Sequence, residues 1–248
     1  MRHQAGDGVG ELDLAAHALG LVADFFKNAR REHIAAGHAH ARRGHLGGGF
    51  FHDFIDAQER AAGGFALTGV KPGFNTHEEN GVSAFEAVTN DSFPGKWKVI
   101  FFYPKDFTFV CPTEIAAFGK LNEEFEDRDT IVLGGSGDNE FSHFNWRATN
   151  EELLEVPFPM FADVRHDLMR ALGVENADGV ADRSTLIIDP DGVIQFVSVT
   201  PDAVGRNVDE VLRVLDALQS EEVCACNWQK NDPTKNIDKM DVLKQELK

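Results

Sequence analysis

Short apolar runs alternate with stretches of helical periodicity from Phe65 onward. A continuous apolar run bounded by turn residues is typical of a buried strand, whereas apolar residues three and four positions apart indicate an amphipathic helix. Residues 78–90 are expected to form a loop with a short helical patch. The remaining pattern predicts, in chain order, strand 97–103, helix 115–128, strand 130–134, helix 139–154, strand 158–162 and helix 166–172.

A hairpin and a final helix complete the pattern. Two apolar runs, 185–188 and 193–199, flank Asp189-Pro190-Asp191-Gly192, which is a strong signal for a turn between paired strands. Residues 207–219 then predict an amphipathic helix. Strands alternating with helices, followed by a hairpin and a helix, are the order of a thioredoxin-like α/β fold, in which helices flank a central mixed sheet. The parallel part of such a sheet needs helices on both faces.

The chain changes in composition near Gly63-Gly64. Residues 1–64 hold seven of the ten histidines, no cysteine, and seven basic against eight acidic residues, whereas the rest of the chain holds 17 basic and 33 acidic residues. We interpret 1–64 as an irregular extension, rich in His, Gly and Ala, that takes no part in function. Residues 65–222 are then the thioredoxin-like domain, and 223–248 form a C-terminal tail.

The histidines of this extension raise the question of a metal site, since His-rich tracts can bind metals. Their spacing matches no dedicated site, and no thiolate or carboxylate is placed to join them. We therefore expect no metal in this segment, whose histidines include His33, His38, His40 and His45.

The net charge of −17 limits the partners of the chain. An acidic surface argues against nucleic acid, whose phosphates are neutralised by basic residues, and equally against an anionic membrane. No run of about 18 apolar residues occurs, so no membrane-spanning helix is expected. Three cysteines are few, and odd in number, for a secreted disulfide scaffold. They fit reduced, reactive thiols in a cytoplasmic protein better.

The most informative stretch is Pro-Lys-Asp-Phe-Thr-Phe-Val-Cys-Pro-Thr-Glu, which runs from Pro104 to Glu114. It places Cys111 where a buried strand turns into a helix, and Pro112 suits the first helical position. The unpaired N–H groups of a helix N-terminus carry partial positive charge and stabilise a thiolate. Cys111 is therefore a candidate nucleophile, although a lone Cys-Pro would more often mark a buried structural cysteine.

Two neighbours of Cys111 suit a small catalytic pocket. The Thr108 hydroxyl can lie beside the sulfur and donate to the thiolate or to a substrate oxygen. Pro104, with its fixed φ and no N–H, can close the pocket against solvent. The pattern Pro-x-x-x-Thr-x-x-Cys ahead of Pro-Thr-Glu resembles the peroxiredoxins, specifically the typical two-cysteine alkyl hydroperoxide reductase C branch. In that family the matching cysteine attacks the O–O bond of a peroxide, and the matching threonine and proline shape its pocket.

The resemblance covers about residues 65–228. Family members usually open with a short strand that carries Gly-x-x-x-Pro-x-Phe just before the sequence seen here as Ala66-Leu67-Thr68. This chain retains only Gly64-Phe65 of that pattern, so the sequence leaves the first strand of the fold open.

A thiolate and a departing oxyanion both require a cation nearby, and arginine is always protonated and presents a rigid donor fork. In the resembled family an arginine just before the hairpin strand contacts the cysteine and the substrate, and Arg183 occupies that place. The alternative is that Arg183 is only a charged side chain at the edge of a strand, without a role at the cysteine. Arg147 is a second candidate, either at the surface or behind the site. Glu114 is expected to orient an arginine by pairing with it.

Cys224 and Cys226 lie in the polar tail, in the sequence Val-Cys-Ala-Cys-Asn-Trp. Peroxide converts a thiolate into a sulfenic acid, which condenses with a second thiol to a disulfide. Cys224 matches the resolving cysteine of the family, which usually comes from the other subunit of a dimer. The family pattern is Val-Cys-Pro before Asn-Trp, and this chain departs from it with Ala225 and the additional thiol of Cys226. A zinc site is the alternative, but it wants four ligands, and the chain has only one other cysteine.

The resemblance implies an enzyme of antioxidant defence that reduces hydrogen peroxide and organic hydroperoxides without a bound cofactor. It also implies a homodimer that assembles into a ring and is re-reduced by a dithiol partner. The Cys-Ala-Cys sequence is similar to that of the actinobacterial members, which use a dedicated small disulfide reductase; thioredoxin or a flavoprotein are the alternatives. Two other functions stay open, a holdase or scaffold built from a ring oligomer and a general thiol–disulfide oxidoreductase. The second would want Cys-x-x-Cys at the helix start, where this chain has Cys-Pro-Thr-Glu.

Overall fold

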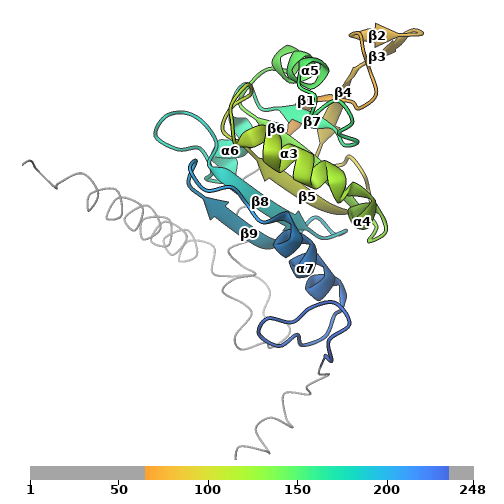
Figure 1. Cartoon of the computed structure of the whole chain (residues 1–248), viewed down its shortest axis with the longest axis vertical. Coiled ribbons are helices and arrows are strands. Elements are labelled where there is room, and N and C mark those ends of the chain that lie inside the picture. Colours follow the sequence, from red (N-terminus) through yellow and green to blue (C-terminus); the bar gives the residue numbers. More distant parts are fainter. Residues whose placement is uncertain (1–64, 235–248) are drawn as a thin grey trace, which may run out of the picture. The chain divides into compact units, whose positions relative to one another are not determined.

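The computed structural model describes residues 65–234, whose helices and strands are labelled in Figure 1. The predictions made for 1–64 and for 235–248 lie outside the described residues. The strands are β1 (Ala66–Val70), β2 (Glu78–Glu79), β3 (Val82–Ser83), β4 (Phe85–Thr89), β5 (Trp97–Phe102), β6 (Thr130–Ser136), β7 (Met160–Ala162), β8 (Arg183–Ile188) and β9 (Ile194–Thr200). The helices are α3 (Cys111–Lys120), α4 (Asn122–Glu126), α5 (Glu140–Thr149), α6 (Asp167–Ala171) and α7 (Val208–Gln219). Within this part of the chain, no helix has the length and apolar character needed to span a membrane.

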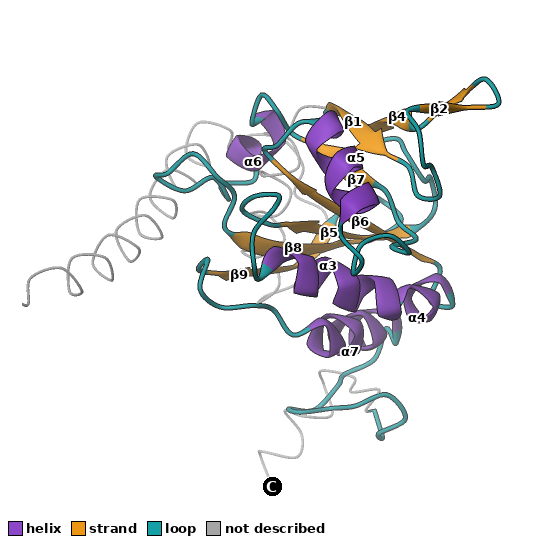
Figure 2. Ribbon diagram, turned by 45° about the horizontal axis from the view of Figure 1, so that its top comes forward, coloured by secondary structure: helices purple, strands orange, loops and turns teal. Residues whose placement is uncertain are grey.

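Seven strands form one mixed sheet in the order β4-β1-β7-β6-β5-β8-β9, and β2 pairs with β3 in a separate two-stranded sheet. Strands β5, β6 and β7 run parallel, whereas the other neighbours in the large sheet pair antiparallel. Helices α3 and α7 lie side by side against the sheet, and α5 packs against β1 and β7 (Figures 1 and 2). The predicted fold class, a central mixed sheet flanked by helices, is confirmed.

Three predicted segments differ from the structure. The helix predicted at 139–154 ends at Thr149, because Asn150 has an extended backbone (φ −107°, ψ 117°). The helix predicted at 115–128 is two helices, because the chain leaves helical geometry at Leu121 (φ −100°, ψ 7°) between α3 and α4. The prediction of a loop with a helical patch at 78–90 is wrong, since this segment contains β2, β3 and β4. Asn80 and Gly81 have φ values of 53° and 76°, the geometry of a two-residue hairpin turn. The Asn-Gly pair was the signal in the sequence for this turn.

The first strand that the structure describes is β1, which begins at Ala66; the segment that would carry the opening strand of the family lies almost wholly outside the described residues. The register of β1 with β4 runs from Ala66 opposite Thr89 to Val70 opposite Phe85. The other edge of β1 pairs with β7, so β1 joins β4 to the rest of the sheet.

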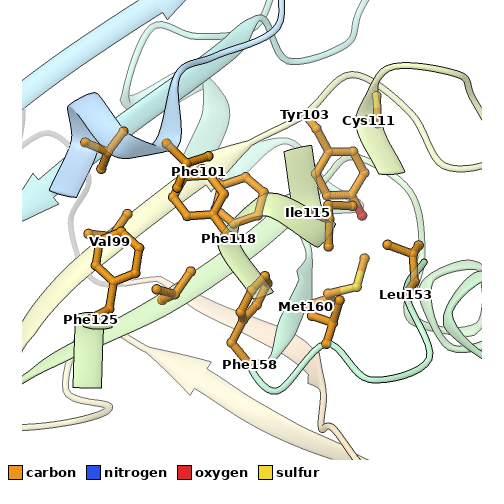
Figure 3. Close-up of a cluster of buried hydrophobic side chains, with 14 of the residues drawn as sticks. Val99, Phe101, Tyr103, Cys111, Ile115, Phe118, Phe125, Leu153, Phe158 and Met160 are labelled. Carbon is orange, nitrogen blue, oxygen red and sulfur yellow. The ribbon is translucent and has the colours of Figure 1, made fainter. Parts of the chain in front are cut away.

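The main apolar core lies between the sheet and helices α3 and α7, and Figure 3 shows part of it. The Phe101 ring of β5 stacks on the Phe118 ring of α3, with centroids 4.2 Å apart. Gly134 of β6 makes room for this pair, because a Cβ at that position would lie 2.5 Å from the Phe101 ring. Buried valine and leucine side chains of α7 complete the cluster. Apolar packing therefore fixes α3, and with it Cys111 at the start of the helix.

We expect Phe118→Ala to lower the free energy of unfolding by about 3–5 kcal/mol, because it removes a stacked ring that has no exposed surface. Equilibrium unfolding in urea, followed by tryptophan fluorescence, measures this change. Leu154→Ala is the control, since Leu154 is 51% exposed and its truncation should cost less than about 0.5 kcal/mol. Equal losses for the two variants would contradict the packing of α3 on the sheet.

Candidate active site around Cys111

Cys111 is the first residue of α3 and follows the loop that leaves the end of β5. Its side chain has no exposed surface and belongs to the edge of the core, near Tyr103 (Figure 3). No side chain caps this helix at Val110, and Pro112 has no N–H of its own. The first turn of α3 therefore keeps its partial positive charge beside the sulfur.

Arg183, at the start of β8, lies against Cys111. Its Nη1 donates to Cys111 Sγ at 3.3 Å and to Glu114 Oε2 at 2.5 Å, while its Nε donates to the Asp202 carbonyl at 2.8 Å. Burial lowers the pKa of the Arg183 guanidinium, but the hydrogen bond to Cys111 and the charge of Glu114 outweigh burial, so the pKa is raised. Arg183 therefore stays charged and directs a donor at the sulfur.

A second arginine, Arg206, belongs to the same cluster and was missed by the sequence reasoning. Its backbone N–H donates to Glu114 Oε1 at 3.0 Å, its Nη2 donates to the Phe102 carbonyl, and its guanidinium lies 5.1 Å from the centre of the Phe101 ring. Burial lowers the pKa of Arg206 to about 10. The signal in the sequence was its place one residue before the N-cap of α7, where a cation is disfavoured by the helix dipole and needs another partner.

The charges of this cluster balance only when Cys111 is ionised. Arg183 and Arg206 are positive and Glu114 is negative, so the cluster carries one net positive charge beside a neutral thiol. A thiolate brings the total to zero, which favours the ionised sulfur. The structure thus brings together Cys111, Glu114 and Arg183 of the predicted site residues, with Arg206 as the addition.

The two predicted pocket residues lie in the loop before α3. Pro104 is buried and Thr108 is half-buried. The Thr108 hydroxyl donates to the Lys105 carbonyl at 3.0 Å, so in this structure it closes a local turn and is not directed at the sulfur. The expectation that this hydroxyl lies beside the thiolate is therefore not met in this conformation.

Arg147 is not part of the Cys111 cluster. Its side chain is buried in α5, donating from Nη1 to the Phe158 carbonyl at 2.9 Å and from Nη2 to the Val156 carbonyl. Burial lowers its pKa to about 10. The surface position considered for Arg147 is wrong, and its observed contacts fix the segment that leads into β7.

The two remaining cysteines follow α7. Cys224 is half-buried, with Sγ 3.4 Å from Ser220 Oγ, and Cys226 is exposed; both are free thiols, as is Cys111. Among residues 65–234, no group of His, Cys, Asp and Glu side chains could hold a metal ion.

The tail that carries these cysteines is anchored beyond them. Trp228 is only 6% exposed, its carbonyl accepts from Arg213 Nη1 at 3.0 Å, and its Nε1 donates to the Asp232 carbonyl at 3.0 Å. The buried ring and the bond from Arg213 of α7 hold the chain to its own subunit at this point, while the bond to Asp232 satisfies the indole N–H within the tail.

We expect Arg183→Ala to slow alkylation of Cys111 by iodoacetamide at neutral pH by roughly tenfold or more, because removal of one cation disfavours the thiolate. Mass spectrometry follows the reaction in a background with Ser at positions 224 and 226, where Cys111 is the only thiol. Arg170→Ala, which removes an arginine that is 60% exposed and paired with Glu175, should leave the rate unchanged. An equal rate in the Arg183 variant and the parent would remove Arg183 from the site.

Comparisons with known proteins agree with this geometry. The AhpC/TSA family pattern matches residues 70–197. The chain is 68% identical over 152 residues to alkyl hydroperoxide reductase C of Mycolicibacterium smegmatis, covering 61% of this chain and 78% of the relative. Among solved structures, Mycobacterium tuberculosis AhpC has a TM-score of 0.62 and 58% identity, covering 67% of this chain and 94% of that chain. A reduced 2-Cys peroxiredoxin of Plasmodium vivax has a TM-score of 0.62 and 32% identity, covering 69% of this chain and 88% of that chain. The chain belongs to the AhpC/TSA family.

Proposed function

We propose that the chain is a thiol-dependent peroxidase in which Cys111 reduces hydrogen peroxide and organic hydroperoxides, as part of antioxidant defence. One observation carries the assignment: a buried sulfur at a helix N-terminus receives a hydrogen bond from the Arg183 guanidinium at 3.3 Å. A structural cysteine has no need of a buried arginine, whereas a peroxidatic thiolate does. The names of the relatives, alkyl hydroperoxide reductase C and 2-Cys peroxiredoxin, support the same function.

The first chemical step is attack of the Cys111 thiolate on one oxygen of the peroxide. A sulfur–oxygen bond forms, the O–O bond breaks, and the departing hydroxide or alkoxide takes a proton to leave as water or alcohol. Cys111 becomes a sulfenic acid. Negative charge moves from the sulfur to the departing oxygen during this step, and the donor that Arg183 directs at the sulfur stabilises this charge. Pro104 and Thr108 form the wall of the peroxide pocket.

The second step is condensation of the sulfenic acid with the thiol of Cys224 from another subunit, which forms a disulfide and releases water. Cys226 serves as a second resolving thiol or passes the disulfide outward. A dithiol reductase then restores both thiols, and a dedicated small disulfide reductase fits the Cys-Ala-Cys sequence, ahead of thioredoxin or a flavoprotein. Free thiols in this cycle suit a cytoplasmic location.

We further infer that the working form is a homodimer that assembles into a ring. Among the described strands, β9 ends the large sheet with one edge unpaired, which is an available site for pairing with a second copy. Phe107, Phe109 and Phe141 are 60%, 95% and 49% exposed. Large apolar side chains in such positions mark a protein–protein contact.

Peroxide consumption with a supplied dithiol tests the main assignment. We expect the parent to turn over and Cys111→Ser to lose turnover, because a hydroxyl is a far weaker nucleophile than a thiolate. Circular dichroism of the serine variant should match the parent, which shows that the fold is retained. Turnover in the serine variant would assign the chemistry to another group.

Non-reducing gels after one equivalent of peroxide test the resolving step. We expect a disulfide-linked dimer that Cys224→Ser nearly abolishes and Cys226→Ser only weakens, because Cys224 occupies the resolving position. Peptide mapping should find Cys111 joined to Cys224. A monomeric oxidised band, or a dimer that depends on Cys226 alone, would contradict this assignment.

A further inference from the structure

A buried polar network holds the loop between β5 and α3, and the reaction steps above leave it without a role. The Tyr103 hydroxyl donates to Asp106 Oδ1 at 2.9 Å, and Asp106 Oδ2 lies 2.8 Å from His143 Nδ1. On the other side of the imidazole, His143 Nε2 lies 3.0 Å from the Phe161 carbonyl oxygen. His143 belongs to α5 and Phe161 to β7, so the network joins the loop to two other elements.

The hydrogen-bond partners of His143 show where hydrogens lie in this network. A carbonyl oxygen only accepts, so Nε2 carries the hydrogen that it donates to Phe161. Nδ1 faces a carboxylate oxygen of Asp106, and two acceptors do not bond without a hydrogen between them. One hydrogen therefore lies between Asp106 Oδ2 and His143 Nδ1, and the Tyr103 hydroxyl lies 3.2 Å from the same nitrogen.

Burial makes this network costly to break. The side chains of His143 and Asp106 are 0% and 2% exposed. Burial, followed by the charge of Asp106, raises the pKa of Tyr103 well above its usual value, so its hydroxyl stays protonated and donates. Loss of Asp106 removes the side chain that ties the loop to this network, while the Tyr103 hydroxyl, 3.2 Å from His143 Nδ1, keeps that nitrogen as a partner.

The backbone of the loop depends on the same contacts. The Asp106 N–H donates to Asp138 Oδ2 at 2.8 Å, and the next residue, Phe107, has a φ of +54°. That left-handed conformation is unfavourable for a bulky residue and persists only where the surroundings enforce it. The Phe107 ring packs on Trp146 of α5, with centroids 5.8 Å apart. Contacts with α5 and with the turn before it thus enforce the conformation of the loop.

We propose that Asp106, His143 and Tyr103 form a latch that positions the loop 104–110 and the start of α3, and thereby sets the fate of oxidised Cys111. The proposal rests on the peroxidase function above. With the latch closed, the sulfenic acid stays in the pocket, where a second peroxide adds an oxygen to sulfur, loses its O–O bond and leaves as water or alcohol, giving a sulfinic acid. With the latch open, α3 loosens and the sulfenic acid reaches a second thiol, forming a disulfide and releasing water. All three are positioning residues, since they act through the loop.

Two substitutions of Asp106 separate the latch from its charge. Asp106→Ala removes both hydrogen bonds of the carboxylate. The amide of Asp106→Asn keeps them without the charge, because Nδ2 donates to a neutral Nδ1 and Oδ1 accepts from Tyr103. We expect Asp106→Ala to slow peroxide oxidation of Cys111 roughly tenfold or more, and to lower the ratio of sulfinic acid to disulfide by a similar factor. Asp106→Asn should keep both quantities within about threefold of the parent. Stopped-flow tryptophan fluorescence measures the rate, and intact mass spectrometry under excess peroxide measures the ratio.

Arg128→Ala is the matched control, because it leaves the contact of Asp216 with Lys230 of the tail in place. It breaks a comparably buried ion pair, whose Arg128 and Asp216 side chains are 8% and 10% exposed, away from the loop. This variant should lose stability but keep the parent ratio of sulfinic acid to disulfide. If Asp106→Ala does not fold, Tyr103→Phe, which removes a single hydroxyl, should shift the ratio in the same direction by a smaller factor.

Two measurements on the reduced protein need no peroxide. Nitrogen-15 NMR should find Nε2 of His143 protonated in both the parent and Asp106→Asn, because the Phe161 carbonyl only accepts. Hydrogen exchange at the Asp106 N–H should be faster in Asp106→Ala than in the parent. An Nε2 of His143 without a proton in the parent, an unchanged ratio in Asp106→Ala, or an Asp106→Asn variant that behaves like Asp106→Ala would overturn the latch. If the parent does not consume peroxide, the peroxidase assignment fails, while the NMR and exchange measurements still decide the latch.

Discussion

The buried carboxylate of Glu114 lies one turn after Cys111 in α3, and the geometry at the sulfur depends on it. It accepts a hydrogen bond from Arg183 at the start of β8 and another from the backbone N–H of Arg206 ahead of α7. Without this carboxylate, two buried guanidiniums would face each other, and burial alone already lowers the pKa of Arg206 to about 10. Buried ion pairs contribute little net stability, but removal of one partner is costly. The cluster therefore acts mainly by fixing where the cations lie relative to the sulfur.

The loop before α3 lies between this cluster and the network of Asp106 and His143. The cluster acts on the charge of Cys111, and the network acts on the backbone that carries it. The start of α3 has no side-chain cap at Val110, and Phe107 just before it has an unfavourable φ. Local opening concentrates where intrinsic stability is low, so this segment opens once its side-chain contacts release it. Such a segment suits a nucleophile that must be fixed during attack on the peroxide and must move before it condenses with a second thiol.

The sequence reveals those parts of this protein that depend on local pattern. The apolar runs locate β5, β6 and β8, because a buried strand must be apolar over its whole length. The sequence around Cys111 also indicates the nucleophile, since Cys-Pro at the end of a strand reports a helix start. The break at Leu121 could not be predicted, because the apolar period continues across it while the backbone turns.

The contacts that complete the site join residues far apart in the chain. Asp106 and His143 are separated by 37 positions, and Glu114 and Arg206 by 92. No periodicity encodes these pairs, which form only when the order of the strands brings their loops together. The one signal of these pairs in the sequence is chemical. An ionisable residue needs a partner elsewhere when it lies in an apolar segment or where a helix dipole disfavours its charge.

Trp228 limits how far the resolving thiols can travel. An extended chain spans at most about 3.5 Å per residue, and Cys224 lies four residues before this anchor, so it moves within about 14 Å of it. Cys226, two residues from the anchor, reaches only about half as far. A disulfide requires Cα atoms roughly 4.4–6.8 Å apart, and Cys111 has no exposed surface. In the proposed resolving step, the start of α3 would open towards the tail of the other subunit, and the longer reach of Cys224 from Trp228 favours it over Cys226 as the first thiol to meet the oxidised sulfur.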